Sequence, residues 1–489
     1  MVVQAPLRDA GTTLSCPAAI PSQNVVRATV QWGLPVQNVA LHTDAGAPAT
    51  PQAPLPPHNH CLRVLRTIIR ADSDPARQTL FARVVQSRPA AGFVYRLHGR
   101  LRGTFAAPFL PSCFGLASFL RILPPANSRA RVLAVASHEN AQQQVVRVMS
   151  WIGPDECDWI RTGYGPAMIS PRRLLQAWQQ APRVLRLVRR IDARYGFLVA
   201  CRTAAALAWY ARATAVLTSH RPGVVLVSSD ANPEEAGVLG AARALGIARV
   251  FVSHAYPTPF SPPLDFTLSI LEGDAAVDAH RGKGPITGRI LLAGIEGDSA
   301  PLDAGRFDRE EPVIGIFPPK AFSWPTFAAI IDDCRRHFRA RRIVVRWHPS
   351  MLEPPRLHQV LSDLSGIVES DRSATLSEVA RQCDWVVAGE NSNVHLPVQK
   401  LGVPTVVVKS LGLYTDDRSD LYGFVANGIV FPPLASLRDL RTDALRAFFT
   451  NWPQRFARYD ASYLSAHRDV GAEVRQAILT LAAGGPTTT

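Results

Sequence analysis

Two successive series of apolar, strand-like runs alternating with helix-like runs constrain the fold of this chain most. The strand-like runs of the first series are RVLAVAS (131–137), GVVLVSS (223–229), ARVFVSH (248–254), DFTLSILEGD (265–274) and GRILLAGI (288–295). Those of the second series are VIGIF (313–317), IVVRWHP (343–349), IVES (367–370), DWVVAGE (384–390) and PTVVVKS (404–410). Such alternation predicts parallel sheets covered by helices on both faces. The sequence therefore predicts an α/β protein with two doubly wound, Rossmann-like domains that face a cleft.

The predicted organisation has six parts, because 489 residues are too many for one hydrophobic core. The first two are a disordered Pro/Ala-rich leader over 1–60 and an Arg-rich region of no assigned role over 61–130. They are followed by the first domain (131–302), a polar linker (303–312), the second domain (313–445), and C-terminal helices with a tail (446–489).

The net charge of +14 raises the question of a nucleic-acid partner. Residues 1–130 hold 13 Arg and 4 Asp with no Lys or Glu, which gives +9 and leaves only about +5 for the rest. The basicity therefore belongs mostly to the N-terminal region. Because no known nucleic-acid recognition motif accompanies it, we expect no nucleic-acid partner.

The sequence also bears on location. Seven scattered cysteines without a CxxC pair suit a reducing cytoplasm, and residues 1–20 do not resemble a secretory signal. The apolar run FAAPFLPSCFGLASFLRIL (105–123) is interrupted by two prolines. It favours a buried core helix, with a short helix on the membrane surface as the alternative. We expect a cytoplasmic protein, with peripheral contact at the inner face of the cell membrane as a further option.

Polar residues gather where the predicted strands end, and ligands of open parallel sheets bind at the carboxyl ends of strands. In the first domain the candidates for acid–base chemistry are Asp230, Glu234, Glu235 and His254. In the second domain the candidates for holding a donor are Arg346, His348, Ser350, Gly389, Glu390, Asn391, Ser392 and Asn393. This clustering allows a nucleotide site without specifying a reaction.

Two of these features have a structural alternative. In AGENSNVH (388–395), Ser392 can cap the following helix, and the amides at that helix start can also hold a phosphate. His348 stands at a strand end before Pro349, where it is either a structural histidine or a phosphate donor. His254 occupies the matching place in the first series, so two histidines are expected at equivalent strand ends.

The order of these motifs resembles a known family. SHAYP (253–257), then VVRWHPS (344–350), then CDWVVAGENSNVHLPVQKLGVPTVVV (383–408) is similar to bacterial glycosyltransferases of the GT-B fold that build capsular and other surface polysaccharides. The His-Pro pair resembles that of bacterial sialyltransferases, polysialyltransferases and CDP-glycerol polymerases. The resemblance covers about residues 131–440.

The resemblance implies a nucleotide-sugar donor on the second domain and an oligosaccharide or lipid-linked acceptor in the cleft. His348 and the amides around Ser392 and Asn393 would hold the donor phosphates. His254 would deprotonate the acceptor hydroxyl, with Glu234, Glu235 and Asp230 as alternatives. The family generally uses no bound metal, so neither a metal nor another cofactor is expected.

One departure leaves other functions open. Related enzymes often carry a ribose-binding Glu in the helix after the second-domain turn, whereas this chain has Pro397 there, which leaves Glu390 or Asp420 for that contact. The alternatives are a sugar-nucleotide 2-epimerase-like enzyme and a non-catalytic subunit of a polysaccharide assembly complex.

Overall fold

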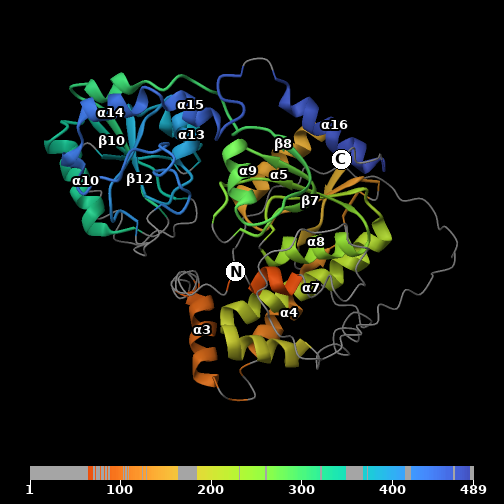
Figure 1. The fold of residues 1–489 in the computed structure, drawn as a ribbon. Helices are drawn as coiled ribbons and strands as arrows, with labels where there is room; N and C mark the ends of the chain where they lie inside the picture. Colours follow the sequence, from red (N-terminus) through yellow and green to blue (C-terminus); the bar gives the residue numbers. More distant parts are fainter. Residues whose placement is uncertain are drawn as a thin grey trace, which may run out of the picture.

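The computed structural model describes parts of 64–129 and then residues 130–162, 184–230, 232–258, 261–319, 322–348, 367–371, 373–412, 420–465 and 468–484. The expected disordered leader over 1–60 lies outside these residues. Figure 1 shows two α/β bodies, with the N-terminal helices beneath the first of them.

The first body is built on a six-stranded parallel sheet in the order β3-β2-β5-β6-β7-β8. Its strands are β2 (Val132–Val135), β3 (Cys157–Trp159), β5 (Val224–Val227), β6 (Ala248–Val252), β7 (Asp265–Leu271) and β8 (Thr287–Leu292). The helices around it are α5 (Glu139–Ile152), α7 (Phe197–His220), α8 (Pro233–Ala244) and α9 (Asp274–Arg281). β2 and β5 are buried at every position because helices cover both faces of the sheet.

The second body holds a five-stranded parallel sheet in the order β11-β10-β9-β12-β13. Its strands are β9 (Val313–Phe317), β10 (Arg342–Val345), β11 (Ile367–Glu369), β12 (Trp385–Ala388) and β13 (Thr405–Val407). Its helices are α10 (Trp324–Arg336), α12 (Leu376–Ala380), α13 (His395–Lys400), α14 (Thr442–Phe449) and α15 (Trp452–Ala457), with short 3-10 turns η2 (Ala304–Asp308) and η3 (Leu437–Asp439). The predicted fold class, two doubly wound α/β units, is confirmed by these two sheets.

The last helix, α16 (Val470–Ala482), returns to the first sheet rather than extending the second (Figure 1). Val474 and Ile478 are fully buried in the same core as Val132, Val148 and Val224. The first sheet is therefore completed by residues from the end of the described chain.

A buried ion pair holds the place where the chain crosses between the bodies. Lys400 on α13 lies 3.0 Å from the carboxylate of Asp460, with the two side chains 2% and 0% exposed. The Lys400 ammonium also donates to the carbonyl of Ile295, and the amide of Ile295 donates to Asp460 at 3.0 Å. Gly294 has φ +73°, and a Cβ there would lie 2.6 Å from Asp460 Oδ1, so only glycine fits beside this pair. The two crossings of the chain thus meet at one point.

The N-terminal region also packs on the first body. Helices α3 (Pro89–Leu101) and α4 (Phe109–Arg121) lie beneath α7, and β1 (Ile122–Leu123) pairs antiparallel with β4 (Arg161–Thr162). The apolar run 105–123 was expected to be a buried core helix. Instead, α4 buries only one side against α7 and exposes Phe109, Phe114 and Leu116. Among the described residues, no helix has the length and apolar character needed to cross a membrane.

Candidate functional site

The strand order of the first sheet reverses beside β2, because β3 follows on one side and β5 on the other. The carboxyl ends of β2 and β5 thus form the crevice where open sheets bind ligands. His138 stands just after β2, Asp230 just after β5, and His254 just after β6. Two of these three residues were predicted from the sequence, while His138 was missed.

His138 and His254 face each other across this crevice, with ring centroids 4.7 Å apart and planes at 65°. Nδ1 of His254 donates to the carbonyl of Ser228, which leaves the lone pair on Nε2. Burial, with a smaller contribution from His138, lowers the pKa of His254 to about 4. His138 is more exposed, and its Nδ1 accepts from the amide of Ala141 at 3.2 Å. At neutral pH His254 is therefore an uncharged imidazole that carries its lone pair on Nε2.

The three predicted carboxyls differ in their surroundings. Glu235 on α8 is completely buried, and its Oε1 accepts from the amide of Ser137 at 2.7 Å, which ties α8 to the end of β2. Burial raises the pKa of Glu235 to about 8 and that of Asp230 to about 7. Glu234 is only partly buried. Because a fully buried carboxyl does not meet an acceptor hydroxyl, Glu235 suits a structural role better than that of the base.

The Glu235→Gln variant is expected to remove a pH dependence of stability. The folded pKa of about 8 lies above the ordinary value of 4.5, so the native state binds the proton more tightly. The stabilisation is present at low pH and is lost as the pH rises through this window. Glutamine keeps an oxygen that accepts from the Ser137 amide, and it is neutral at every pH. The midpoint temperature of thermal unfolding should therefore fall less in the variant than in the wild type between about pH 5 and pH 8.

The exposed Glu139→Gln, at the start of α5, is the matched control for this experiment, because its carboxyl is in water. Parallel pH curves for the wild type and both variants would show that the Glu235 carboxyl does not carry the proton.

In the second sheet the order reverses between β9 and β12, and the predicted donor residues follow β10 and β12. β10 ends at Val345, so Arg346, Trp347 and His348 lie beyond the strand rather than within it. Trp347 is 8% exposed and packs against Phe327, with ring centroids 5.5 Å apart. Arg346 and His348, on either side of it, stay partly exposed, and burial lowers the pKa of Arg346. Ser350 lies outside the described residues.

The turn after β12 is held by a buried histidine that the sequence interpretation missed. His395 donates from Nε2 to the carbonyl of Gly389 at 3.0 Å, and its Nδ1 contacts the hydroxyl of Thr405 at 2.9 Å. A Cβ at Gly389 would come within 2.9 Å of Pro319, so glycine allows the close approach of β9 and β12.

The prediction that Ser392 caps the following helix is wrong. α13 begins at His395, Val394 takes the N-cap position, and no side chain caps that end. Ser392 instead accepts from the amide of Val394 at 3.4 Å within the turn. The reason is that the turn runs two residues further than the Ser-based signal indicates. With only six residues, α13 offers little helix dipole for a phosphate.

Two asparagines of this turn make longer connections. Asn391 accepts from the amide of Leu421 at 2.8 Å, which fixes the loop that carries Asp420. Asn393 accepts from the amide of Tyr256 at 3.2 Å, and Tyr256 stands two residues after His254. Between these asparagines and β12, Glu390 is partly buried, and burial raises its pKa. The Asn393–Tyr256 contact brings the predicted strand ends of the two bodies together.

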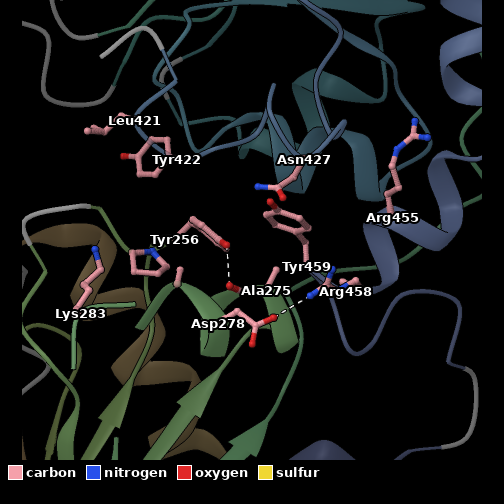
Figure 2. A pocket seen from close by; sticks show the side chains of 12 residues that line it. Tyr256, Ala275, Asp278, Lys283, Leu421, Tyr422, Asn427, Arg455, Arg458 and Tyr459 are labelled. Atoms are coloured by element: carbon pink, nitrogen blue, oxygen red, sulfur yellow. Dashed lines mark hydrogen bonds and ion pairs between the residues drawn. The ribbon is translucent and has the colours of Figure 1, made fainter. Parts of the chain in front are cut away.

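A cavity of about 340 Å³ opens next to this contact, between α9 and the segment around α15 (Figure 2). Its residues are Tyr256, Pro257, Ala275, Asp278, Ala279, Lys283, Leu421, Tyr422, Asn427, Arg455, Arg458 and Tyr459. None of the sequence-predicted candidates for catalysis or donor binding lines it. Because these residues come from four separate segments, no local pattern could have revealed the cavity.

Comparison with known proteins finds likeness in architecture alone. No protein-family model matches the chain, and no curated protein is similar to it in sequence. Similar solved structures include a UDP-N-acetylglucosamine 2-epimerase (15% identity, 74% of this chain and 99% of that one, TM-score 0.43) and the calicheamicin glycosyltransferase CalG4 (11%, 73% and 99%, 0.44). A third is MurG of Acinetobacter baumannii (11%, 71% and 94%, 0.37). At these identities and TM-scores, the assignment of the fold rests on the two sheets themselves.

Proposed function

We propose that the protein is a glycosyltransferase that moves a sugar from a nucleotide-activated donor to a surface polysaccharide or lipid-linked glycan without a bound metal. The observation that carries this proposal is the hydrogen bond from the Tyr256 amide to Asn393, since it places the His254 segment of one sheet against the β12 turn of the other. Acid–base groups on one wall and cations on the other suit transfer from a charged donor to a hydroxyl.

In the proposed reaction the two bodies have different roles. Nε2 of His254 takes the proton of the acceptor hydroxyl while the hydroxyl oxygen bonds to the anomeric carbon of the donor sugar. The bond from that carbon to the donor phosphate breaks, and the nucleotide leaves with the electron pair. Arg346 and His348 stabilise the negative charge on the leaving phosphate, together with the amides of the Gly389–Asn393 turn.

The test begins with the donor. Thermal unfolding is measured with a panel of UDP, CMP and GDP sugars, and a ligand present at 100 times its Kd should add about 2.7 kcal/mol of stability. The responding sugar nucleotide is then incubated with oligosaccharide and lipid-linked acceptors, and a chromatographically larger glycan is expected. Interconversion of the free sugar nucleotide without an acceptor would identify an epimerase. Nucleotide binding without turnover of any donor would identify a non-catalytic subunit.

The His348→Ala variant is expected to weaken nucleotide binding by about 1–3 kcal/mol, the usual loss for a hydrogen bond to a charged group. That corresponds to a Kd about 5 to 150 times higher, measured by calorimetry. His337→Ala, which removes an exposed histidine at the end of α10, is the matched control. Unchanged affinity of His348→Ala for every nucleotide that binds the wild type would remove His348 from the donor site.

A further inference from the structure

Large apolar side chains are exposed on two successive helices of the N-terminal region. Phe93 and Val94 on α3 are 61% and 39% exposed, and Phe109, Phe114 and Leu116 on α4 are 54%, 51% and 41% exposed. Among the described residues these are five of nine large hydrophobic side chains with such exposure. Two 13-residue helices, α3 and α4, thus hold more than half of them, and these five residues are here named the α3–α4 surface.

The opposite sides of both helices are well packed. His98 on α3 lies 2.8 Å from Asp192 and stacks on Phe197 at a centroid distance of 4.2 Å. On α4, a Cβ at Gly115 would come within 3.0 Å of Ala204 of α7. Phe93 and the exposed residues of α4 therefore lie on the outer sides of anchored helices, while Val94, four residues before His98, lies nearer the packed side of α3. Within the described residues no further layer of the fold covers these side chains.

The segment of the chain that carries these two helices contains strongly charged residues of one sign only. Residues 77–130 contain eight Arg and no Lys, Asp or Glu, although the whole chain has 39 acidic residues. Arg96 and Arg100 are exposed and follow Phe93 at three and seven positions, which places them on the same face of α3. The stretch of chain that carries the apolar side chains thus contains arginines and no acidic residue.

We propose that the α3–α4 surface docks on an anionic lipid bilayer. Apolar side chains that enter the boundary between headgroups and acyl chains, with cations at the level of the phosphates, are the features of an interfacial helix. A second copy of the chain would bring like charge against like charge. A nucleic acid would match the arginines but would leave aliphatic residues such as Val94 and Leu116 unused. This inference is independent of the proposed transferase activity.

The experiment measures sedimentation of the full chain with vesicles. Vesicles of equimolar phosphatidylcholine and phosphatidylglycerol should bind the protein, while phosphatidylcholine alone should bind it much more weakly, and added salt should release it. Phe93→Ser with Phe114→Ser should weaken binding about tenfold or more, because two large apolar side chains no longer leave water. Arg96→Gln with Arg100→Gln should weaken it about thirtyfold, at about 1 kcal/mol for each arginine near the surface.

The controls carry equal changes elsewhere. Leu245→Ser alters an exposed apolar residue outside the surface, and Arg289→Gln with Arg341→Gln removes the same net charge from exposed positions. Both should bind like the wild type. The arginine pair is exposed, so it tests the surface even where the serine pair lowers stability.

Four results would overturn the inference. They are failure of the wild type to bind anionic vesicles, equal binding to both lipid compositions, loss of binding in the controls to the same extent, and full binding by both surface variants. A dimer of the wild type that dissociates in the serine pair, without vesicle binding, would identify a second copy as the occupant. Binding of RNA or DNA through Arg96 and Arg100 without vesicle binding would identify a nucleic acid instead.

Discussion

Replacement of His254 by alanine is expected to lower turnover about 10²- to 10⁴-fold, the usual loss for a general base. The sharper variant is His254→Asn, because its amide can still donate to the Ser228 carbonyl as Nδ1 does but offers no base in place of Nε2. It should keep the fold and the nucleotide affinity and lose turnover. Initial rates of glycan transfer measure the effect.

The pH profile separates a base from a positioning residue. Burial lowers the pKa of His254 to about 4, so the acidic limb of the rate should lie near that pH rather than near the ordinary histidine value. The limb should disappear in the residual activity of His254→Asn. His280→Asn is the matched control, since His280 is 3% exposed and its pKa is also lowered to about 4 by burial. Near-normal turnover of His254→Asn would move the role of the base to Asp230 or Glu234.

The second large effect is on stability. Asp460→Asn is expected to destabilise the protein by about 3–5 kcal/mol, because it leaves the buried Lys400 ammonium without its counter-charge. Asparagine keeps an oxygen that can accept from the amide of Ile295, so the loss reports on the charge rather than on that hydrogen bond. The expected result is a lower midpoint of unfolding in urea or on heating.

Adding Lys400→Met to Asp460→Asn should restore most of that loss, because the double variant buries no charge. The exposed pair of Arg446 and Asp308, 2.8 Å apart, is the control, and Asp308→Asn should cost less than about 1 kcal/mol. A loss below about 1 kcal/mol for Asp460→Asn would mean that water reaches Lys400 and that the pair does not hold the crossing.

The sequence predicted the two sheets because buried parallel strands are continuous apolar runs, a signal that depends on local residues alone. The same signal placed Arg346, His348 and His254 near strand ends, although it carried the strand of IVVRWHP past Val345, where β10 ends. His138 was missed because a polar residue after a strand and before a helix is typical of an N-cap, which His138 also is. Ser392 was misassigned for the converse reason, since a good capping residue stood two positions before the turn ended.

The contacts that assemble the site could not be predicted because they join distant segments. Tyr256 and Asn393 are separated by 137 positions in the sequence. Neither of their motifs, SHAYP and AGENSNVH, indicates that the other motif is its contact partner. The same holds for Lys400 and Asp460. The assigned boundaries of the domains stay predictions, and the packing of α16 on the first sheet crosses them.

The return of α16 to the first sheet has a consequence for biosynthesis. Val474 and Ile478 emerge from the ribosome only after the entire second body has been translated. Translation proceeds at about 5–20 residues per second, so on the order of ten to forty seconds pass between the synthesis of the first sheet and that of α16. During this time the apolar side chains of Val132, Val148 and Val224 are incompletely covered. The body that is synthesised first is therefore the one that is finished last, and nascent chains of this protein should depend on chaperones during that interval.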